Sequence, residues 1–308
     1  MPLYAGFDFG GTQLKYGLID NDGAIIKQAQ VDSPAKVPEL LQLLEKIWKD
    51  LKRTEEQAIK AVGFGIPGVL SLKEQKILQS PNYPDIDNFE LVPALSRFIE
   101  VPFTINNDAN MAAFGEYKKG GGMGVHSMVL LTIGTGLGTG IILEEKIWQG
   151  VGGFGGELGH ATVNLNGEPC KCGSTGCLET EVSGPKIVKN YKTITQSGES
   201  LDPEDIYQRA CRGDEAALEA FSTAGRFLGI GLSIAINLLN PEKILLGGGV
   251  MKAGDFLFKP AVEEARKRSF KASFECCRIE RAVLGNLAGF IGSAFYAKEH
   301  GISQFSQA

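Results

Sequence analysis

The stretch that decides the fold lies near the N-terminus and reads Leu3-Tyr-Ala-Gly-Phe-Asp8-Phe-Gly-Gly-Thr12-Gln-Leu-Lys15-Tyr-Gly-Leu-Ile-Asp20. Apolar residues predict one strand over residues 3–9 and a second over 13–20. The turn motif Asn21-Asp-Gly23 then predicts a hairpin into a third strand over 24–31. The chain is therefore expected to begin with three antiparallel strands joined by two turns.

The first of these turns has the composition of a phosphate-binding loop. It contains Asp8, Gly10, Gly11 and Thr12. Glycines between two antiparallel strands let backbone N–H groups approach an anion, and the Thr12 hydroxyl adds a donor. The Asp8 carboxylate suits the hydration shell of Mg²⁺ rather than a phosphate. A β-turn that uses Asp and Gly only for its conformation would have the same sequence.

The same pattern returns after Gly120-Gly-Gly122, a glycine-rich joint. Strands are predicted over 127–133 and 140–143, and the turn between them reads Gly134-Thr135-Gly136-Leu-Gly-Thr139. A dinucleotide fingerprint would need a helix after the glycines, whereas a strand follows here. We interpret the two hairpins as an internal duplication with two opposed phosphate turns, of which the second has no counterpart of Asp8.

The rest of the chain alternates predicted helices and strands, as in an α/β fold. Helices are predicted over residues 38–53, 89–99, 111–118, 184–191, 202–212, 215–239, 256–268 and 286–300. Further strands are predicted over residues 61–66, 101–105, 147–150, 243–246 and 276–281. Residues 77–84 are predicted to form a loop, because prolines and Asn interrupt them.

Asp108 lies where one of these strands ends and the next helix begins, in Asn106-Asn107-Asp108-Ala109-Asn110. Ligands of open α/β sheets collect at such positions. The helix N-terminus makes the carboxylate a weak base, but phosphoryl transfer asks mainly for positioning and charge stabilisation. The alternative is that Asp108 only caps the helix.

Three consecutive glycines, Gly247, Gly248 and Gly249, follow the predicted strand over 243–246. Because they have no side chains, a flat base or a ribose can lie directly against the backbone. A flexible turn without a ligand is the alternative.

A cluster of metal-ligand residue types follows the second hairpin. Gly153-Phe-Gly-Gly-Glu157-Leu-Gly-His160 is followed, nine residues later, by Cys170-Lys-Cys172-Gly-Ser-Thr-Gly-Cys177-Leu-Glu179. Zinc commonly occupies a Cys₃His set as a closed structural site. We therefore interpret the zinc here as structural, holding the loop in place, rather than as a Lewis-acid catalyst. The four predicted ligands are His160, Cys170, Cys172 and Cys177. Free or disulfide-bonded cysteines in a glycine-rich loop are the alternative.

Two carboxylates flank these ligands, since Glu157 precedes the histidine by three residues and Glu179 follows the last cysteine by two. A knuckle that fixes two carboxylates beside itself predicts a site for a polar ligand. The other cysteines are Cys211, Cys276 and Cys277. The adjacent pair is interpreted as plain strand residues, because the chain has no Cys-x-x-Cys motif.

Composition narrows the classes of partner. The chain has 308 residues, enough for two domains or one duplicated fold, and a formal net charge of −5 from 31 basic and 36 acidic residues. No basic patch for nucleic acid is indicated. The N-terminus lacks the basic region of a signal peptide, and the apolar run over 227–239 is too short and glycine-rich to span a membrane. We expect no nucleic-acid or membrane partner and a cytoplasmic location.

Taken together, these motifs resemble the ROK family of sugar kinases, within the actin-like or hexokinase-like ATPase fold. The resemblance covers nearly the whole chain and is most specific in the zinc stretch. It implies an α/β fold with duplicated ribonuclease H-like domains, a cleft between them and a zinc knuckle. The implied domains are residues 1–108, completed by the C-terminal helix over 286–308, and residues 109–285 with the zinc loop.

The resemblance also implies where ligands bind. ATP and Mg²⁺ would contact Asp8, Gly10, Gly11, Thr12, Lys15, Gly134, Thr135, Gly136, Gly247, Gly248 and Gly249. The sugar would contact Asn107, Asp108, Glu157, His160 and Glu179. Asp108 would take the proton of the attacking hydroxyl, and His160 would bind structural zinc with one ring nitrogen and face the sugar with the other.

The implied activity is that of an ATP-dependent hexose kinase, glucokinase-like, which phosphorylates glucose at its 6-hydroxyl and forms a homodimer. Carboxylates such as Glu157 and Glu179 suit a ring of hydroxyl groups, because a hydrogen-bonding site rejects ligands that leave its groups unpaired. Mannose, fructose, allose, N-acetylglucosamine and N-acetylmannosamine stay open as the sugar, and polyphosphate as the donor. A sugar-responsive repressor is disfavoured, since only seven residues precede Asp8 where a helix-turn-helix segment would be needed.

Overall fold

The computed structural model describes residues 1–10, 13–34, 36–54, 58–71, 76–80, 87 and 89–305. For Thr54, Gln79 and residues 302–305 it describes the backbone alone. Gly11 and Thr12, which belong to the first predicted phosphate turn, lie outside the described residues.

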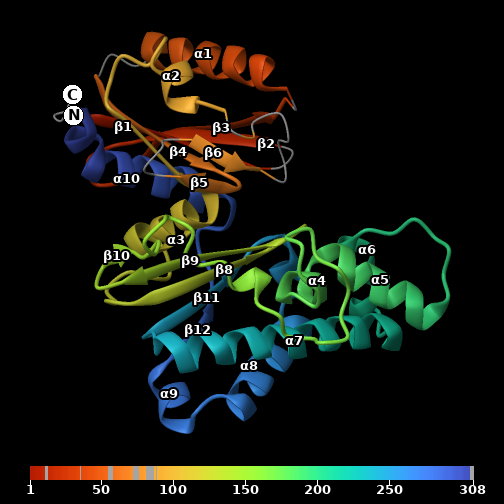
Figure 1. Cartoon of the computed structure of the whole chain (residues 1–308). Helices are drawn as coiled ribbons and strands as arrows, with labels where there is room; N and C mark the ends of the chain where they lie inside the picture. The colour runs from red at the N-terminus through yellow and green to blue at the C-terminus, as the bar shows by residue number, and fades with distance from the viewer. Residues whose placement is uncertain are drawn as a thin grey trace.

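Two five-stranded sheets with the same strand order form the framework (Figure 1). The first sheet has the order β3-β2-β1-β4-β7, with β1 (Leu3–Phe9), β2 (Gln13–Ile19), β3 (Ile25–Asp32), β4 (Ile59–Ile66) and β7 (Phe103–Asn107). The second has the order β10-β9-β8-β11-β12, with β8 (Met128–Ile133), β9 (Leu137–Leu143), β10 (Lys146–Ile147), β11 (Lys243–Gly247) and β12 (Arg278–Arg281). In each sheet the three hairpin strands pair antiparallel and the other strands pair parallel. The predicted duplication is confirmed by this repeated order.

Helices cover both faces of each sheet. They are α1 (Val37–Thr54), α2 (Leu91–Leu95), α3 (Asp108–Lys119), α4 (Leu178–Val182), α5 (Gly184–Thr195), α6 (Pro203–Cys211), α7 (Glu215–Leu239), α8 (Asp255–Arg268), α9 (Lys271–Cys276) and α10 (Ala288–Phe305). Short 3₁₀ helices are η2 (Leu158–His160), η3 (Gly249–Ala253) and η4 (Gly285–Leu287), and β5 (Val69–Ser71) pairs with β6 (Lys76–Gln79).

Two helices, α3 and α10, lie between the sheets (Figure 1). α10 packs on β1 and β4, α3 packs on β8 and β9, and the two helices pack on each other. Their backbones touch, because a side chain at Gly115 or Gly292 would overlap the backbone of the opposite helix. The segment before Asp108 therefore belongs to the first sheet, while the helix that begins there covers the second.

The outer faces carry separate apolar cores. α1 buries Leu40, Leu44 and Trp48 on the first sheet. α7 and α8 pack together on the second sheet, where Phe221 and Leu228 are buried. By length and composition α7 could cross a membrane, but half of its most apolar window is buried inside the protein, as in a core helix.

Several local predictions are wrong at their ends. The helix expected over 89–99 is limited to Leu91–Leu95, because Phe89 instead forms a β-bridge with Ile77. Ile77 lies in β6, so the loop expected over 77–84 begins as a strand, and residues 81–84 lie outside the described residues. The strand expected over 276–281 starts later, since Cys276 ends α9. Local composition does not reveal such pairings between distant segments.

A buried carboxylate clamps the two connections that cross between the sheets. Glu116 of α3 is fully buried, and its Oε2 accepts from the N–H of Gly121, 2.9 Å away. Its Oε1 accepts from the N–H groups of Val283, at 3.0 Å, and Leu284, at 2.7 Å. The Gly121 carbonyl accepts from Lys243, at 2.7 Å. Gly121 of the glycine-rich joint is thus held at both its N–H and its C=O, and the connection that leads into α10 is held at two N–H groups.

We expect Glu116→Gln to lower the free energy of unfolding by about 2 kcal/mol, because an amide nitrogen cannot accept and leaves a buried N–H without a partner. The shift in the midpoint of urea unfolding measures this loss. Glu275→Gln, at an exposed position with a 3.9 Å pair to Lys271, is the matched control and should leave the midpoint unchanged. Equal midpoints for Glu116→Gln and the unmodified protein would contradict the clamp.

Candidate active site

Asp108 is the first residue of α3, but it does not cap the helix. The N-cap is Asn107, whose Oδ1 accepts from the N–H groups of Ala109, at 2.9 Å, and Asn110, at 3.1 Å. Asn107 Nδ2 also donates to the carbonyl of Gly68, at 3.2 Å. The Asp108 carboxylate also accepts from Ala109 N–H, at 2.9 Å, a donor that it shares with Asn107. Because Asn107 does the capping, the half-buried Asp108 side chain is left for another role.

Four carboxylates influence one another around Asp108. Burial raises the pKa of Asp108 to about 6, opposed by Ala109 N–H and helped by the charge of Glu157. Burial and then Asp108 raise the pKa of Asp8 to about 7, while Lys15 lowers it. Burial also raises the pKa of Glu157, with His160 opposing and Glu179 adding to the shift. Such a group of like charges favours a cation and a ligand rich in hydroxyl donors.

Asp8 lies at the end of β1, beside the first turn of α10. Its carboxylate occupies the space that a side chain at Gly289 would fill. Lys15 is the register partner of Asp8 on β2, so the two side chains share one face of the sheet. Gly10 N–H donates to Gln13 C=O, at 2.9 Å, which closes the described part of the first turn.

The second glycine turn, over residues 134–138, contacts one of the four carboxylates, Glu179 of α4. Glu179 Oε2 accepts from Leu137 N–H, at 2.8 Å, and a Cβ at Gly136 would lie 2.5 Å from the same oxygen. Gly134 N–H donates to Gly136 C=O, at 2.9 Å, and the Gly134 carbonyl accepts from Gly184 N–H, at 2.9 Å. The turn is therefore closed by hydrogen bonds and packed against Glu179, which is expected to bind the sugar.

The third glycine segment lies beside the second. β11 runs parallel to β8 with Gly247 opposite Thr132, and Gly248, with φ of 89°, lies so close to Ile133 that a side chain there would overlap its backbone. A Cβ at Gly249, in contrast, would meet open space. A cavity of ≈ 30 Å³ opens there and is lined by Pro203, Glu204, Tyr207, Phe221, Gly249, Val250, Lys252 and Ala253.

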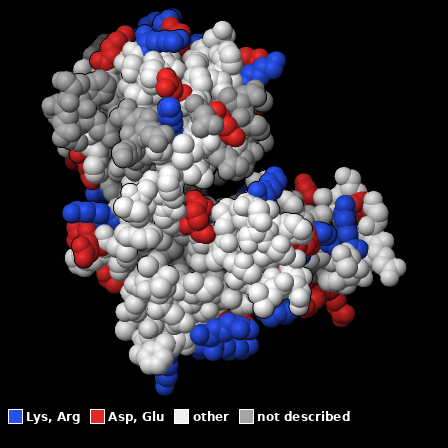
Figure 2. Space-filling model, viewed as in Figure 1, with Lys and Arg blue, Asp and Glu red and all other residues white. Residues whose placement is uncertain are grey.

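The surface is indented between the half that contains the first sheet and the half that contains the second, with acidic side chains at the inner end of the indentation (Figure 2). A larger cavity, of ≈ 420 Å³, lies elsewhere, between α1 and residues 97–100. We place the candidate site around the four interacting carboxylates and the Gly136 turn, which lie close to one another, because none of them lines the larger cavity.

The four predicted metal ligands converge. The ligand atoms of His160, Cys170, Cys172 and Cys177 all lie within 4.8 Å of one another. His160 Nδ1 is 3.6 Å from Cys170 Sγ, and the sulfurs of Cys172 and Cys177 are 3.6 Å apart. Tetrahedral zinc would place two sulfurs about 3.8 Å apart and a sulfur and an imidazole nitrogen about 3.5 Å apart. The set therefore fits zinc. All six cysteines are free, so the disulfide-bonded part of the alternative is contradicted, whereas the part with free cysteines is not.

The two nitrogens of His160 face different groups. Nδ1 lies among the sulfurs, while Nε2 is 3.9 Å from Glu157 Oε2. Burial, with Cys172 and Cys170 beside it, raises the pKa of Cys177 to about 12, so this thiol would ionise at neutral pH only next to a cation. The ring thus connects the cluster to the carboxylates.

The family is decided by the match over residues 4–300 to the family model described as ROK family. The chain belongs to the ROK family. It is 34% identical to the glucokinase of Halalkalibacterium halodurans, with 96% of this chain and 95% of that protein covered. It also resembles the xylose repressor of Bacillus spizizenii, at 30% identity over 96% of this chain and 77% of the repressor.

The fold is confirmed by a solved relative. The ROK family glucokinase from Streptomyces griseus, in complex with glucose and AMPPNP, is 30% identical, with a TM-score of 0.84, covering 96% of this chain and 99% of that one. The expected α/β fold with two duplicated halves of the actin-like ATPase type is therefore confirmed for this ROK protein.

Glu181, which the sequence analysis missed, holds the loop between the predicted metal ligands His160 and Cys170 of this ROK protein. Glu181 of α4 is 2% exposed and accepts from Asn164 Nδ2, at 2.9 Å. Lys186 of α5 lies 3.4 Å from Glu181 and 2.7 Å from Glu168. The loop between His160 and Cys170 is thus tied to two helices. Gly289 beside Asp8 was also missed, because no local motif marks either feature.

Proposed function

We propose that this ROK protein is a glucokinase that transfers the γ-phosphoryl group of ATP to the 6-hydroxyl of glucose. The observation that carries this function is Asp108. It is half-buried and does not cap α3, because Asn107 does. It interacts electrostatically with Asp8 on one side and with Glu157 on the other. A base in that position can meet a sugar held by Glu157 and a phosphate held beside Asp8.

The sugar site combines the five predicted residues. Glu157 and Glu179 would accept from sugar hydroxyls, and His160 Nε2, which faces Glu157, would contact the sugar as well. One Glu179 oxygen already binds Leu137 N–H, which fixes the orientation of the other. Asn107 has its oxygen committed to the cap, so its amide group would serve as a donor. These fixed acceptors and donors would select among hexoses by the hydroxyls that they leave unpaired.

Asp108 would act as the general base. With its pKa near 6, the carboxylate is ionised at neutral pH yet more basic than an ordinary aspartate, contrary to the weak base expected at a helix N-terminus, because burial outweighs the N–H contact. As the bond between the sugar oxygen and the γ-phosphorus forms, the hydroxyl proton moves to Asp108, and the bond from that phosphorus to the bridging oxygen breaks to release ADP. The reaction depends mainly on in-line placement of the hydroxyl and the phosphate, which the hydrogen-bonded glycine turns would support.

Two metal ions would support these residues. Mg²⁺, held through Asp8, would neutralise charge on the β- and γ-phosphates. The raised pKa of Asp8 fits such a partner, since a cation would compensate for its burial. Zinc on His160, Cys170, Cys172 and Cys177 would have no open position and would hold the knuckle in place.

The nucleotide would lie along the three glycine segments. The phosphates would contact Gly10, Gly11, Thr12 and Lys15 on one side and Gly134, Thr135 and Gly136 on the other. The adenosine would lie against Gly247, Gly248 and Gly249, at the cavity lined in part by Tyr207 and Lys252.

We expect Gly249→Ala to raise the KM for ATP by about 10-fold without a loss of stability or of sugar affinity. The added methyl group would meet open space in the free protein and so would intrude only on the nucleotide. Steady-state kinetics with each substrate varied in turn measure both KM values. Gly198→Ala, which also points into open space, is the matched control. An unchanged KM for ATP would contradict binding of the adenosine at this turn.

A panel of hexoses in a coupled ADP-release assay tests the function. We expect glucose to give the highest kcat/KM, ahead of mannose, fructose, allose, N-acetylglucosamine and N-acetylmannosamine. Polyphosphate in place of ATP tests the donor. Glucose binding without ADP release would instead favour a sugar-responsive regulator, as the resemblance to the xylose repressor allows.

The remaining assignments are proposals that rest on the resemblance to the family. We propose a cytoplasmic homodimer, without nucleic-acid or membrane partners, in which residues 1–108 and 286–308 form one domain and residues 109–285 the other. The packing of α10 on β1 and β4 supports this division. Light scattering that gives the mass of one chain would contradict the dimer.

A further inference from the structure

Asn106 organises the turn that presents Asp108. It lies in β7, is 1% exposed, and is the residue before the N-cap. Its Oδ1 accepts from the N–H of Asn107, at 2.8 Å, and from the side chain of Asn110, at 3.3 Å. One buried oxygen therefore joins the last residues of the strand to the first turn of α3.

The third donor to this oxygen comes from a distant part of the chain. Gln149 Nε2 donates to Asn106 Oδ1 at 2.7 Å, across 43 residues of sequence. Gln149 follows β10 of the second sheet, whereas Asn106 lies in the first sheet. The hydrogen bond thus bridges the two halves of the molecule immediately beside the candidate base.

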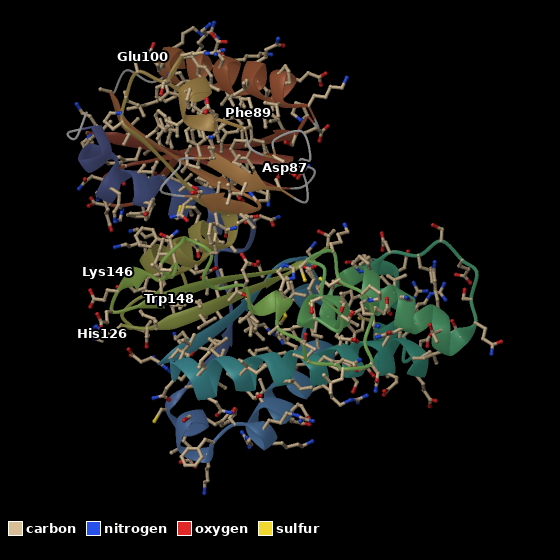
Figure 3. The ribbon with its side chains drawn as sticks, in the orientation of Figure 1. Asp87, Phe89, Glu100, His126, Lys146 and Trp148 are labelled. Atoms are coloured by element: carbon tan, nitrogen blue, oxygen red, sulfur yellow. The ribbon has the colours of Figure 1, made fainter. Side chains whose placement is uncertain are left out.

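Gln149 also closes the loop that leads to Glu157. Its carbonyl accepts from Gly155 N–H, at 2.8 Å, so the two ends of the 149–155 loop are hydrogen-bonded to each other. We call this pair of residues the neck of the loop. The Trp148 ring lies against Gly155, and Trp148 N–H donates to Ile141 C=O, at 2.8 Å. In Figure 3, Trp148, Lys146 and His126 are labelled on the side of the second sheet opposite α5 and α6. Glu157 follows two residues after the neck.

We propose that Gln149 is a positioning residue that sets the separation between Glu157 and Asp108 by tying the neck of the 149–155 loop to Asn106. This rests on the proposed function, since it concerns the geometry of sugar and base. Within the second half, the segment before Glu157 is held by the Trp148 N–H bond to Ile141 C=O and by the bond that closes the loop. The tie to Asn106 adds a contact from this segment to the first sheet, beside Asp108.

The tie affects sugar and nucleotide differently. Among the contacts described, those of Gln149 and its loop neck reach the turn around Asp108 and the segment before Glu157. The glycine segments expected to bind ATP are joined to other residues, Gln13, Gly184 and Ile133. A displaced loop should therefore weaken glucose binding and misplace its hydroxyl, while ATP binds as before. An error of about 1 Å in such placement can lower a rate by about 10²-fold.

Gln149→Leu and Gln149→Glu test the tie. Leucine fills similar space without a donor, and glutamate has the same shape but turns an acceptor toward Asn106. In both we expect the KM for glucose to rise about 10-fold and kcat to fall about 10-fold, with the KM for ATP unchanged. Glucose affinity measured by calorimetry should fall by the same factor. Val151→Gln, on the same loop but outside the tie, is the matched control and should behave like the unmodified protein.

A double-mutant cycle with Glu157→Gln separates positioning from general support of the fold. If Gln149 acts through Glu157, Gln149→Leu should cost much less glucose affinity in the Glu157→Gln background. Unchanged glucose affinity in both Gln149 variants would overturn the proposal. So would an additive cycle, or a lower kcat with an unchanged KM for glucose. Calorimetry judges the tie whether or not the protein transfers phosphate, so its failure is distinct from a failure of the proposed function.

Discussion

Asp108→Asn is expected to lower kcat by at least about 10²-fold, the lower end of the effect of a lost general base. The amide has the shape of the carboxylate and can still accept from Ala109 N–H, so the turn should keep its conformation. It cannot take up the proton of the sugar hydroxyl. Because Asn107 provides the cap, the loss cannot be attributed to a frayed helix. Glucose binding should be retained, since Glu157, His160 and Glu179 are untouched.

The measurement is the ADP-release rate at saturating glucose and ATP, with glucose affinity determined by calorimetry. Asp22→Asn, in the exposed turn between β2 and β3, is the matched control and should keep the kcat of the unmodified protein. Turnover of Asp108→Asn at the level of the unmodified protein would remove Asp108 from its proposed role. A loss of glucose affinity equal to the loss of rate would assign it to binding instead.

The same carboxylate should determine how kcat/KM decreases at acidic pH. The base must be ionised, so kcat/KM should fall as the pH drops through about 6, the pKa of Asp108 in the free protein. Asp8, with a pKa of about 7, is coupled to Asp108 and belongs to the same limb, which should therefore extend between these two values.

Cys172→Ser is expected to remove the metal and, with it, stability and glucose affinity. Cys172 is the exposed member of the set, whereas Cys170 and Cys177 are 8% and 0% exposed, so serine at 172 changes a ligand without leaving a defect in the core. Without zinc, His160 would lose the contact that orients its ring, and Nε2 would no longer be held toward Glu157. We expect glucose affinity to fall by about 10-fold or more.

Metal analysis of the purified protein, thermal unfolding and glucose calorimetry measure these three losses together. The ion pairs of Lys186 with Glu181 and Glu168 should keep part of the loop folded, so the protein is expected to lose affinity and stability without unfolding completely. Cys276→Ser, at the exposed end of α9, is the matched control and should retain zinc. Absence of zinc from the unmodified protein would contradict the role proposed for the knuckle.

The sequence by itself determined the duplicated framework and the Cys₃His cluster. Both are local: hairpins follow from apolar runs separated by glycine turns, and the predicted zinc ligands apart from His160 lie within eight residues. The helix over Glu215–Leu239 was likewise predicted at both ends; in the structure Asp214 caps its start, and Asn240, with φ of 43°, ends it.

Only the tertiary structure decided which residues are available for catalysis and which residues position them. Whether Asp108 or Asn107 caps α3 depends on side-chain hydrogen bonds that adjacent Asn and Asp residues could each make. The clamp from Glu116 to Leu284 joins residues 168 positions apart, and the tie from Gln149 to Asn106 joins residues 43 apart. Such contacts form because two sheets and two central helices bring the segments together, and a side chain that meets its partner only after folding leaves no periodic pattern in the sequence.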